Sequence, residues 1–174
     1  MRRINRAEQD PTFSKFWSEM TKDFFKVEVL QNYAEDWGES YKAWLDGDKE
    51  KARELLKKEP GWQEGKEKVN KIRVHIVEEP LTTYLEWEIE YYKLVNIPKV
   101  GEKVFLLDKS EIKADLKIPK GDILIFDKKK VIENIYNNNG LSTGSKIYEN
   151  PEELKPFLEL RDIILRSNLQ EVTS

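Results

Sequence analysis

The chain has 174 residues, of which 36% are charged and 39% hydrophobic, and this length is typical of one domain with its own core. The 30 basic residues are balanced by 33 acidic ones, which argues against a basic surface directed at nucleic acid. The lack of cysteine excludes disulfides, thiolate metal sites and cysteine nucleophiles, and no apolar run approaches the ~20 residues that span a bilayer, so we predict a cytoplasmic protein with no membrane partner.

The first half of the chain is predicted to be mainly helical. Residues 1–11 show no periodic apolar pattern and are expected to form a flexible arm. Apolar residues then recur at helical spacing over 12–24, and 25–30 alternates briefly as a short strand would. Two more helices are predicted within 36–58, because the Glu-Pro-Gly sequence at 59–61 ends the helical pattern.

The second half is predicted to be richer in strands. Residues 72–77 alternate as a half-buried strand does, and Glu79-Pro80 is expected to open a helix, since proline suits the first helical turn. The Asn-Asn-Asn-Gly sequence at 137–140 predicts a tight turn. Asn150 is expected to cap the last helix. Residues 169–174 after this helix are expected to form a frayed tail. Further strands are predicted at 104–107, 123–126, 131–136 and 145–148.

These elements together predict the α+β class of fold. The expected domain covers residues 12–168 and has a helical N-terminal half. A small antiparallel meander is expected in the C-terminal half, closed by the C-terminal helix.

Three short features of the sequence are candidates for a functional site. Residues 140–146 have only three residues between their glycines, with Ser before Lys, so they fit a hairpin better than a phosphate-binding loop. Residues 128–130 are three lysines at a turn, which is typical of a solvated tip. His75 is the only histidine, which excludes a multi-histidine metal site. Its position opposite Val74 and Ile76 on the strand predicts a surface or groove residue.

The carboxylates near the middle of the chain suggest either a site or an ion network. Glu79 and Glu88 adjoin apolar positions and are expected to be partly buried. A buried carboxylate needs a cation or several donors, and Arg73 is the nearest candidate partner. A structural ion pair is favoured over a functional site.

Residues 73–88 read Arg-Val-His-Ile-Val-Glu-Glu-Pro-Leu-Thr-Thr-Tyr-Leu-Glu-Trp-Glu. This segment resembles the central signature of a family of uncharacterised, mainly actinobacterial proteins that are often encoded beside helix-turn-helix regulators. The resemblance extends over 13–165, where Asn96 and Gly101-Glu102 recur in the same order. It implies no known reaction. It implies a set of polar residues that form a candidate binding cluster: Glu28, Arg73, Glu79, Tyr84, Glu88 and Asp127.

The leading hypothesis is an uncharacterised, non-enzymatic accessory protein that binds or regulates. Its partner would be a protein such as a helix-turn-helix regulator, with no direct contact to nucleic acid and no cofactor. The alternative is a metal-dependent hydrolase of a phosphate ester or nucleotide, in which Glu79, Glu88 and Asp127 hold a divalent cation and Arg73 faces phosphate. A third hypothesis is a component of a mobile-element defence or toxin–antitoxin pair.

Overall fold

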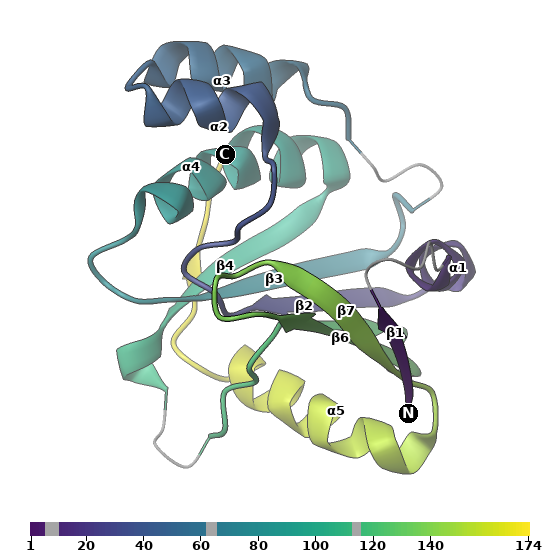
Figure 1. The fold of residues 1–174 in the computed structure, drawn as a ribbon. Helices are drawn as coiled ribbons and strands as arrows, with labels where there is room; N and C mark the ends of the chain where they lie inside the picture. The colour runs from purple at the N-terminus through teal and green to yellow at the C-terminus, as the bar shows by residue number, and fades with distance from the viewer. Residues whose placement is uncertain (6–10, 62–65, 113–115) are drawn as a thin grey trace.

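The computed structural model describes residues 1–5, 11–61, 66–112 and 116–174. Within these ranges eight strands form one mixed sheet in the order β1-β7-β6-β5-β2-β3-β4-β8, with helices on both of its faces (Figure 1). The strands are β1 (Arg2–Asn5), β2 (Asp23–Glu28), β3 (Asn70–Val77), β4 (Glu102–Asp108), β5 (Ile123–Phe126), β6 (Lys130–Tyr136), β7 (Ser142–Tyr148) and β8 (Gln170–Glu171). The helices are α1 (Thr12–Glu19), α2 (Gly38–Leu45), α3 (Lys49–Lys58), α4 (Thr83–Tyr91), the π-helix η1 (Tyr92–Val100), the short η2 (Lys109–Glu111) and α5 (Pro151–Leu165).

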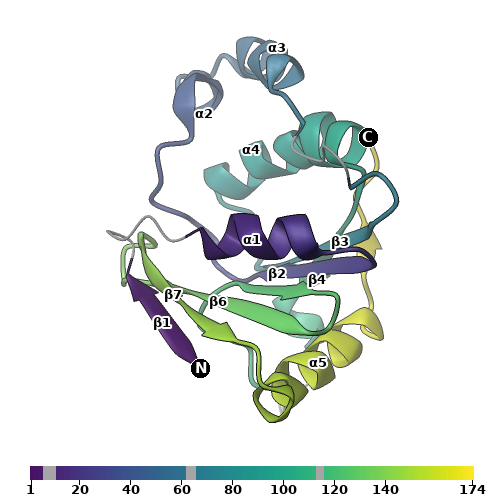
Figure 2. The same cartoon turned by 90° about the vertical axis from the view of Figure 1, so that its right-hand side faces the viewer.

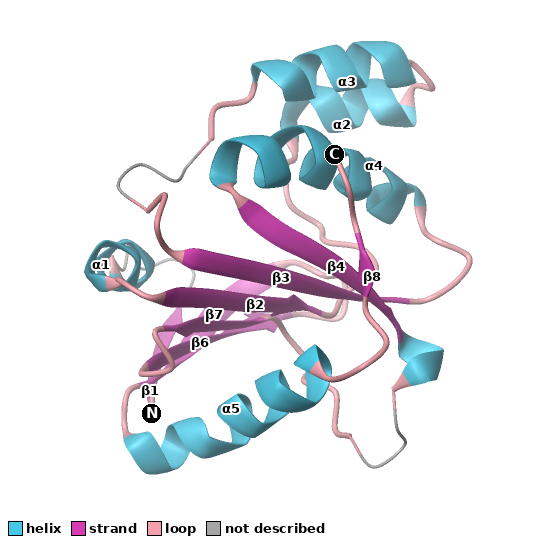
Figure 3. Cartoon of the chain, turned by 180° about the vertical axis from the view of Figure 1, so that it is seen from behind, coloured by secondary structure: helices cyan, strands magenta, loops and turns pink. Residues whose placement is uncertain are grey.

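The centre of the sheet is parallel. Strand β3 pairs in parallel with β2 on one side and with β4 on the other, while the remaining pairs are antiparallel. Parallel neighbours need a long crossover. Here α2 and α3 form the crossover from β2 to β3, and α4 with η1 forms the next one. Figure 3 shows that both crossovers lie on the same side of the sheet.

The two faces of the sheet have different coverings. Helix α5 packs on one face, where Leu154 and Ile164 join the cluster that contains Val27 and Val74. The opposite face carries α1 at one end, over Phe126, and α2, α3 and α4 at the other (Figure 2). We call α2, α3, α4 and η1 together the cap. Since side chains alternate along a strand, every second residue of β2 and β3 points toward the cap.

The predicted fold class is wrong. The sheet is neither small nor antiparallel, because β2 from the expected helical half lies at its centre and pairs in parallel with β3. The antiparallel meander of β5, β6 and β7 is present, but it is only one part of this larger sheet. Local periodicity predicts strands one at a time, whereas pairing across a helical crossover depends on contacts distant in sequence.

The sequence predicts where two helices begin, and the structure confirms one of these starts and corrects the other. Helix α5 begins as predicted, with the Asn150 side chain accepting a hydrogen bond from the backbone N–H of Glu152 at 3.1 Å. Helix α4 begins at Thr83, later than the Pro80 position predicted, because Thr82 is its cap and accepts from the backbone N–H of Leu85 at 3.2 Å. A hydroxyl that satisfies a free helical donor outweighs the preference of proline for the first turn.

The two ends of the chain also enter the sheet. Residues 2–5, within the expected arm, form β1 and pair with β7, while 6–10 lie outside the described residues. Residues 170–171, within the expected tail, form β8 and pair with β4. Among the helices of the described ranges, none combines the length and the apolar character that crossing a membrane requires.

Candidate functional site

A row of charged side chains crosses the sheet beneath the cap. Lys26 lies opposite Arg73 in the parallel pairing of β2 with β3, and Glu28 lies opposite His75. Their neighbours in sequence face α5, so these four side chains face the cap. Three of them are almost fully buried, with exposed fractions of 4% for Glu28, 7% for Arg73 and 0% for His75. Charges at this depth require partners.

Arg73 is the centre of this network. Its Nη1 lies 2.8 Å from Glu28 Oε2, while its Nε and Nη2 donate to the two oxygens of Glu102 at 2.7 and 3.2 Å. Burial opposes the charge of Arg73, but Glu102 and Glu28 outweigh it and hold the pKa of Arg73 well above its ordinary value. Glu102 also accepts from Asn96 Nδ2 at 2.9 Å.

Glu28 has both oxygens engaged by basic or hydroxyl groups. Lys26 Nζ donates to its Oε1, and Tyr92 donates to its Oε2 at 2.7 Å. Burial raises the pKa of Glu28, but Arg73 and then Lys26 outweigh it, so that its pKa lies well below the ordinary value. Glu28 is therefore ionised at neutral pH.

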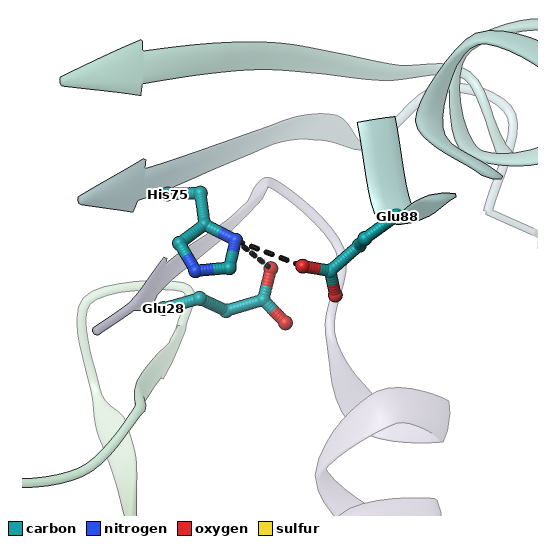
Figure 4. Close-up of side chains that lie close together, drawn as sticks. All are labelled: Glu28, His75 and Glu88. Carbon is teal, nitrogen blue, oxygen red and sulfur yellow. Dashed lines mark ion pairs between the residues drawn. The ribbon is translucent and has the colours of Figure 1, made fainter. Parts of the chain in front are cut away.

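The contacts of His75 indicate an imidazolium. Its Nε2 lies 2.8 Å from the carbonyl oxygen of Leu30, which can only accept, so Nε2 carries a proton. Its Nδ1 lies 2.9 Å from the Tyr92 hydroxyl, whose own proton is given to Glu28. Nδ1 must therefore donate as well. Figure 4 shows Glu28 and Glu88 beside this nitrogen, with Glu88 Oε2 at 3.1 Å.

The pKa of His75 agrees with this protonation state. Burial lowers the pKa of the imidazole, but the carboxylates of Glu88 and Glu28 raise it more, to about 9. His75 is therefore charged at neutral pH, and both ring nitrogens are engaged. The sequence-based expectation of a surface or groove position for His75 is wrong, because the cap covers the face of β3 that alternation alone assigned to solvent.

A cavity of about 330 Å³ lies between this network and the helices. We call it the cap cavity. Lys26, Glu28 and Arg73 line it from the sheet, and aromatic rings line it from α4, from η1 and from Trp37, the residue before α2. Its lining residues are Lys26, Glu28, Asp36, Trp37, Ser40, Glu59, Arg73, Tyr84, Trp87, Glu88, Tyr91, Tyr92 and Asn96.

Several polar atoms of the cavity lining are buried without a hydrogen bond. Tyr84 donates to Glu88 Oε1 at 2.8 Å, and burial followed by Glu88 raises the pKa of the Tyr84 hydroxyl. Asn96 Oδ1 and Trp87 Nε1 have no hydrogen-bond partner among the described residues. Glu88 Oε2 also accepts no hydrogen bond there, although it lies 3.1 Å from His75 Nδ1. Most buried polar groups in native proteins are satisfied, so two such atoms around one cavity are unusual.

One group of side chains has the composition of a metal site. The ligand atoms of Glu28, His75 and Glu88 lie within 4.8 Å of one another. However, Lys26, Arg73 and Tyr92 already engage the oxygens of Glu28. A metal ion would have to displace these groups and the Nδ1 proton of His75, so the arrangement favours an ion network.

Four of the six residues of the predicted cluster meet at the cap cavity: Glu28, Arg73, Tyr84 and Glu88. The other two do not. Glu79 follows the end of β3 and is exposed, although we expected it to be partly buried. Asp127 follows β5, and its carboxylate reaches the start of β2, where it accepts from the backbone N–H groups of Thr21, Lys22 and Asp23. Since β2 and β3 are parallel, Glu79 and Asp127 lie at opposite ends of them.

This placement gives Asp127 a structural role that mutation can test. We expect Asp127→Asn to lower the free energy of unfolding by about 1–3 kcal/mol, because one of the two acceptor oxygens becomes an amide that faces N–H donors. Asparagine tolerates the positive φ of 51° at this position. Urea denaturation measures the loss. The exposed Asp46 is the control, and Asp46→Asn should change stability by about 0.5 kcal/mol or less. Equal stability of the two variants would contradict this role.

Sequence reasoning missed several residues of the network. Lys26 and His75 alternate with apolar residues, a pattern that usually marks a solvated face. Tyr92 follows Leu85 and Ile89 at helical spacing, which predicts only a buried packing position. Asn96 and Glu102 belong to the pattern of the family resemblance, which was the one signal able to find them.

Comparison with known proteins identifies a family and little more. Residues 11–169 match the model of a domain of unknown function, DUF6879, while no curated protein matches. Among solved structures, the archaeal chromatin protein TrmBL2, whose structure shows a novel mode of DNA binding, is similar over 96% of this chain and 53% of its own, with 13% identity and a TM-score of 0.45. The chain thus spans about half the length of that protein, and a likeness this distant carries no argument about function. The family match covers nearly the whole chain, and the chain belongs to the DUF6879 family.

Proposed function

We propose that the chain is a non-enzymatic binding module whose ligand is a small polar molecule held in the cap cavity. The observation that carries this proposal is the presence of unsatisfied buried atoms on Trp87 and Asn96, both of which line that cavity. Each unsatisfied buried group costs about 1–3 kcal/mol. A ligand that supplies the missing partners would recover part of this cost on binding.

The size and lining of the cavity support a small ligand. A volume of about 330 Å³ is near the lower end of the range for small-molecule sites. Trp37 and Trp87 have ring centroids 6.0 Å apart on its wall. Rigid aromatic walls with a few polar groups are typical of binding sites.

The protonation of the network argues against acid–base catalysis. An efficient general base has a pKa near the working pH, whereas His75 has a pKa of about 9 and both ring nitrogens engaged. The hydrolase hypothesis needs Glu79 and Asp127 at one cation, and these residues lie at opposite ends of the parallel strands. We therefore infer binding without turnover.

The proposal is tested by the melting temperature of the protein against a panel of small polar molecules. A ligand at about 100 times its dissociation constant should stabilise the fold by roughly 2.7 kcal/mol. Trp37→Ala removes one wall of the cap cavity and should abolish the shift. Trp17→Ala is the matched control, since Trp17 does not line the cap cavity but an adjoining one, which shares only Lys26 and Arg73 with it. A panel with no stabilising molecule, or shifts that survive Trp37→Ala, would overturn the proposal.

We also propose that the module acts in the cytoplasm through a protein partner, a helix-turn-helix regulator being the candidate that the family resemblance implies. The helices that line the cavity also form the outer surface of the cap, so a ligand beneath them is placed to affect a partner bound above. Affinity purification from the native host, with and without a panel ligand, tests this. Recovery of no regulator in either condition would count against it.

A further inference from the structure

We infer that the ligand of the cap cavity is a small organic cation with N–H donors, such as a primary ammonium or a guanidinium group, seated between Glu88 Oε2 and Asn96 Oδ1. This inference rests on the proposed function, since it specifies the ligand of the same cavity. It follows from the hydrogen-bonding state of the lining, its charge and its aromatic rings.

The basic groups of the cavity are already occupied. All three nitrogens of Arg73 contact Glu28 or Glu102, and Lys26 donates to Glu28. An anionic ligand would have to break these buried ion pairs and leave Glu28 or Glu102 without a cation. Breaking a buried pair is strongly destabilising, so the cavity selects against anions.

The free groups are mostly acceptors. Glu88 and Asn96 are 7% and 2% exposed. Glu88 Oε2 and Asn96 Oδ1 accept no hydrogen bond among the described residues, although Glu88 Oε2 lies 3.1 Å from the charged His75. The orientation of the Asn96 amide is fixed, because its Nδ2 donates to Glu102 and a carboxylate only accepts. Its free end is therefore the oxygen. A ligand that satisfies both oxygens must donate at two points.

The charge of the lining is negative. The carboxylates of Glu28, Asp36, Glu59 and Glu88 line the cavity against two basic side chains, Lys26 and Arg73. Of the buried carboxylates near the cavity, Glu28 and Glu102 pair with Arg73, and Glu88 pairs with the charged His75. The excess of negative charge comes from Asp36 and Glu59, which are exposed, and it attracts cations toward the cavity from solution.

The aromatic rings favour an organic cation over a metal ion. Five rings line the cavity, on Trp37, Tyr84, Trp87, Tyr91 and Tyr92. Ring faces attract ammonium and guanidinium groups and pack against their carbon chains. A hard metal ion would instead need about six oxygen ligands, whereas the cavity leaves one carboxylate oxygen and one amide oxygen without hydrogen bonds.

Three probes with one skeleton test the charge of the ligand in the unaltered protein. They are phenethylamine, phenethyl alcohol and 3-phenylpropionate, which differ mainly in the charge of the polar end. Isothermal calorimetry should show phenethylamine binding about tenfold or more tightly than the alcohol, because a charge-assisted hydrogen bond to Glu88 is gained. The carboxylate probe should bind most weakly.

Two variants test whether the cationic group of the ligand binds at Glu88. Glu88→Gln should weaken phenethylamine binding about tenfold or more, while phenethyl alcohol binding should change little. The control is Glu86→Gln on the same helix, since the Glu86 side chain is 47% exposed and pairs with Lys49. It should bind phenethylamine as the unaltered protein does. Circular dichroism verifies that both variants are folded, and the probe series in the unaltered protein does not depend on them.

The outcomes separate this inference from the proposed function. Equal or tighter binding of the alcohol or the carboxylate probe, lost in Trp37→Ala, would overturn the cationic ligand but leave a ligand cavity in place. Undiminished phenethylamine binding by a folded Glu88→Gln variant would contradict the binding of the cationic group at Glu88. Failure of all three probes and of the whole panel would overturn both proposals.

Discussion

Replacement of Arg73 by methionine is expected to lower the free energy of unfolding by about 3–5 kcal/mol, the usual cost of removing one partner from a buried ion pair. Methionine fills much of the same volume, so most of the loss comes from charge. Glu28 and Glu102 would keep their buried carboxylates without the guanidinium that pairs with both. Urea denaturation followed by circular dichroism measures the change.

The matched control for this change is Arg53→Met on the cap. Arg53 also pairs with a glutamate, its Nε lying 2.7 Å from Glu90 Oε2, but the Arg53 side chain is 44% exposed. A solvated pair contributes about 0–1 kcal/mol, so this variant should remain close to the unaltered protein. If Arg73→Met lost no more stability than Arg53→Met, the network would not be a determinant of the fold.

Stability is expected to fall as pH rises from 6.5 to about 9, by about 3 kcal/mol in total. The cause is His75, whose pKa is raised from an ordinary 6.5 to about 9 in the folded state by Glu88 and Glu28 acting against burial. Below pH 6.5 the imidazole is protonated in both states, and this contribution is fully present. Above it the unfolded chain loses the proton that the folded protein retains, and the contribution is gone once pH exceeds the folded pKa.

Denaturation curves across this pH window measure the effect, and His75→Asn should flatten the dependence while leaving other titrating groups in place. Because His75 is the only histidine, its imidazole signals in an NMR titration need no assignment. We expect an imidazolium spectrum at neutral pH with a midpoint near 9. A midpoint near 6.5 would show that the two carboxylates do not stabilise the charged ring.

Several individual helices and strands could be predicted from the sequence, whereas the pairing of the strands in the sheet could not. The Asn150 cap and the apolar runs at 123–126 and 131–136 act locally, and the structure places a helix and two strands at those positions. The parallel alignment of Val27 with Val74 depends on helices that fold back between the two strands. No local pattern encodes such a contact, so the mixed sheet could not be predicted.

The candidate site also contains residues that could be predicted from the sequence and residues that could not. The family resemblance selected Glu28, Arg73, Tyr84 and Glu88, which meet at one cavity. Alternation along β3 left His75 on the face assigned to solvent, because the pattern reports which side a residue occupies and not what covers that side. The pattern alone indicates that the charged side chains on this face are exposed to solvent. They form a buried network because the cap covers them.

The π-helix that follows α4 makes the candidate site sensitive to chain length. Glu88 lies on the α-helical part, Asn96 lies on η1, and Glu102 begins β4 directly afterwards. Inserting or deleting one residue in an α-helix turns every later side chain by about 100°. An indel between Glu88 and Asn96 would therefore rotate the amide out of the cavity and away from Glu102. We expect members of this family that keep the cavity to keep the spacing of these three residues, even where surface loops vary in length.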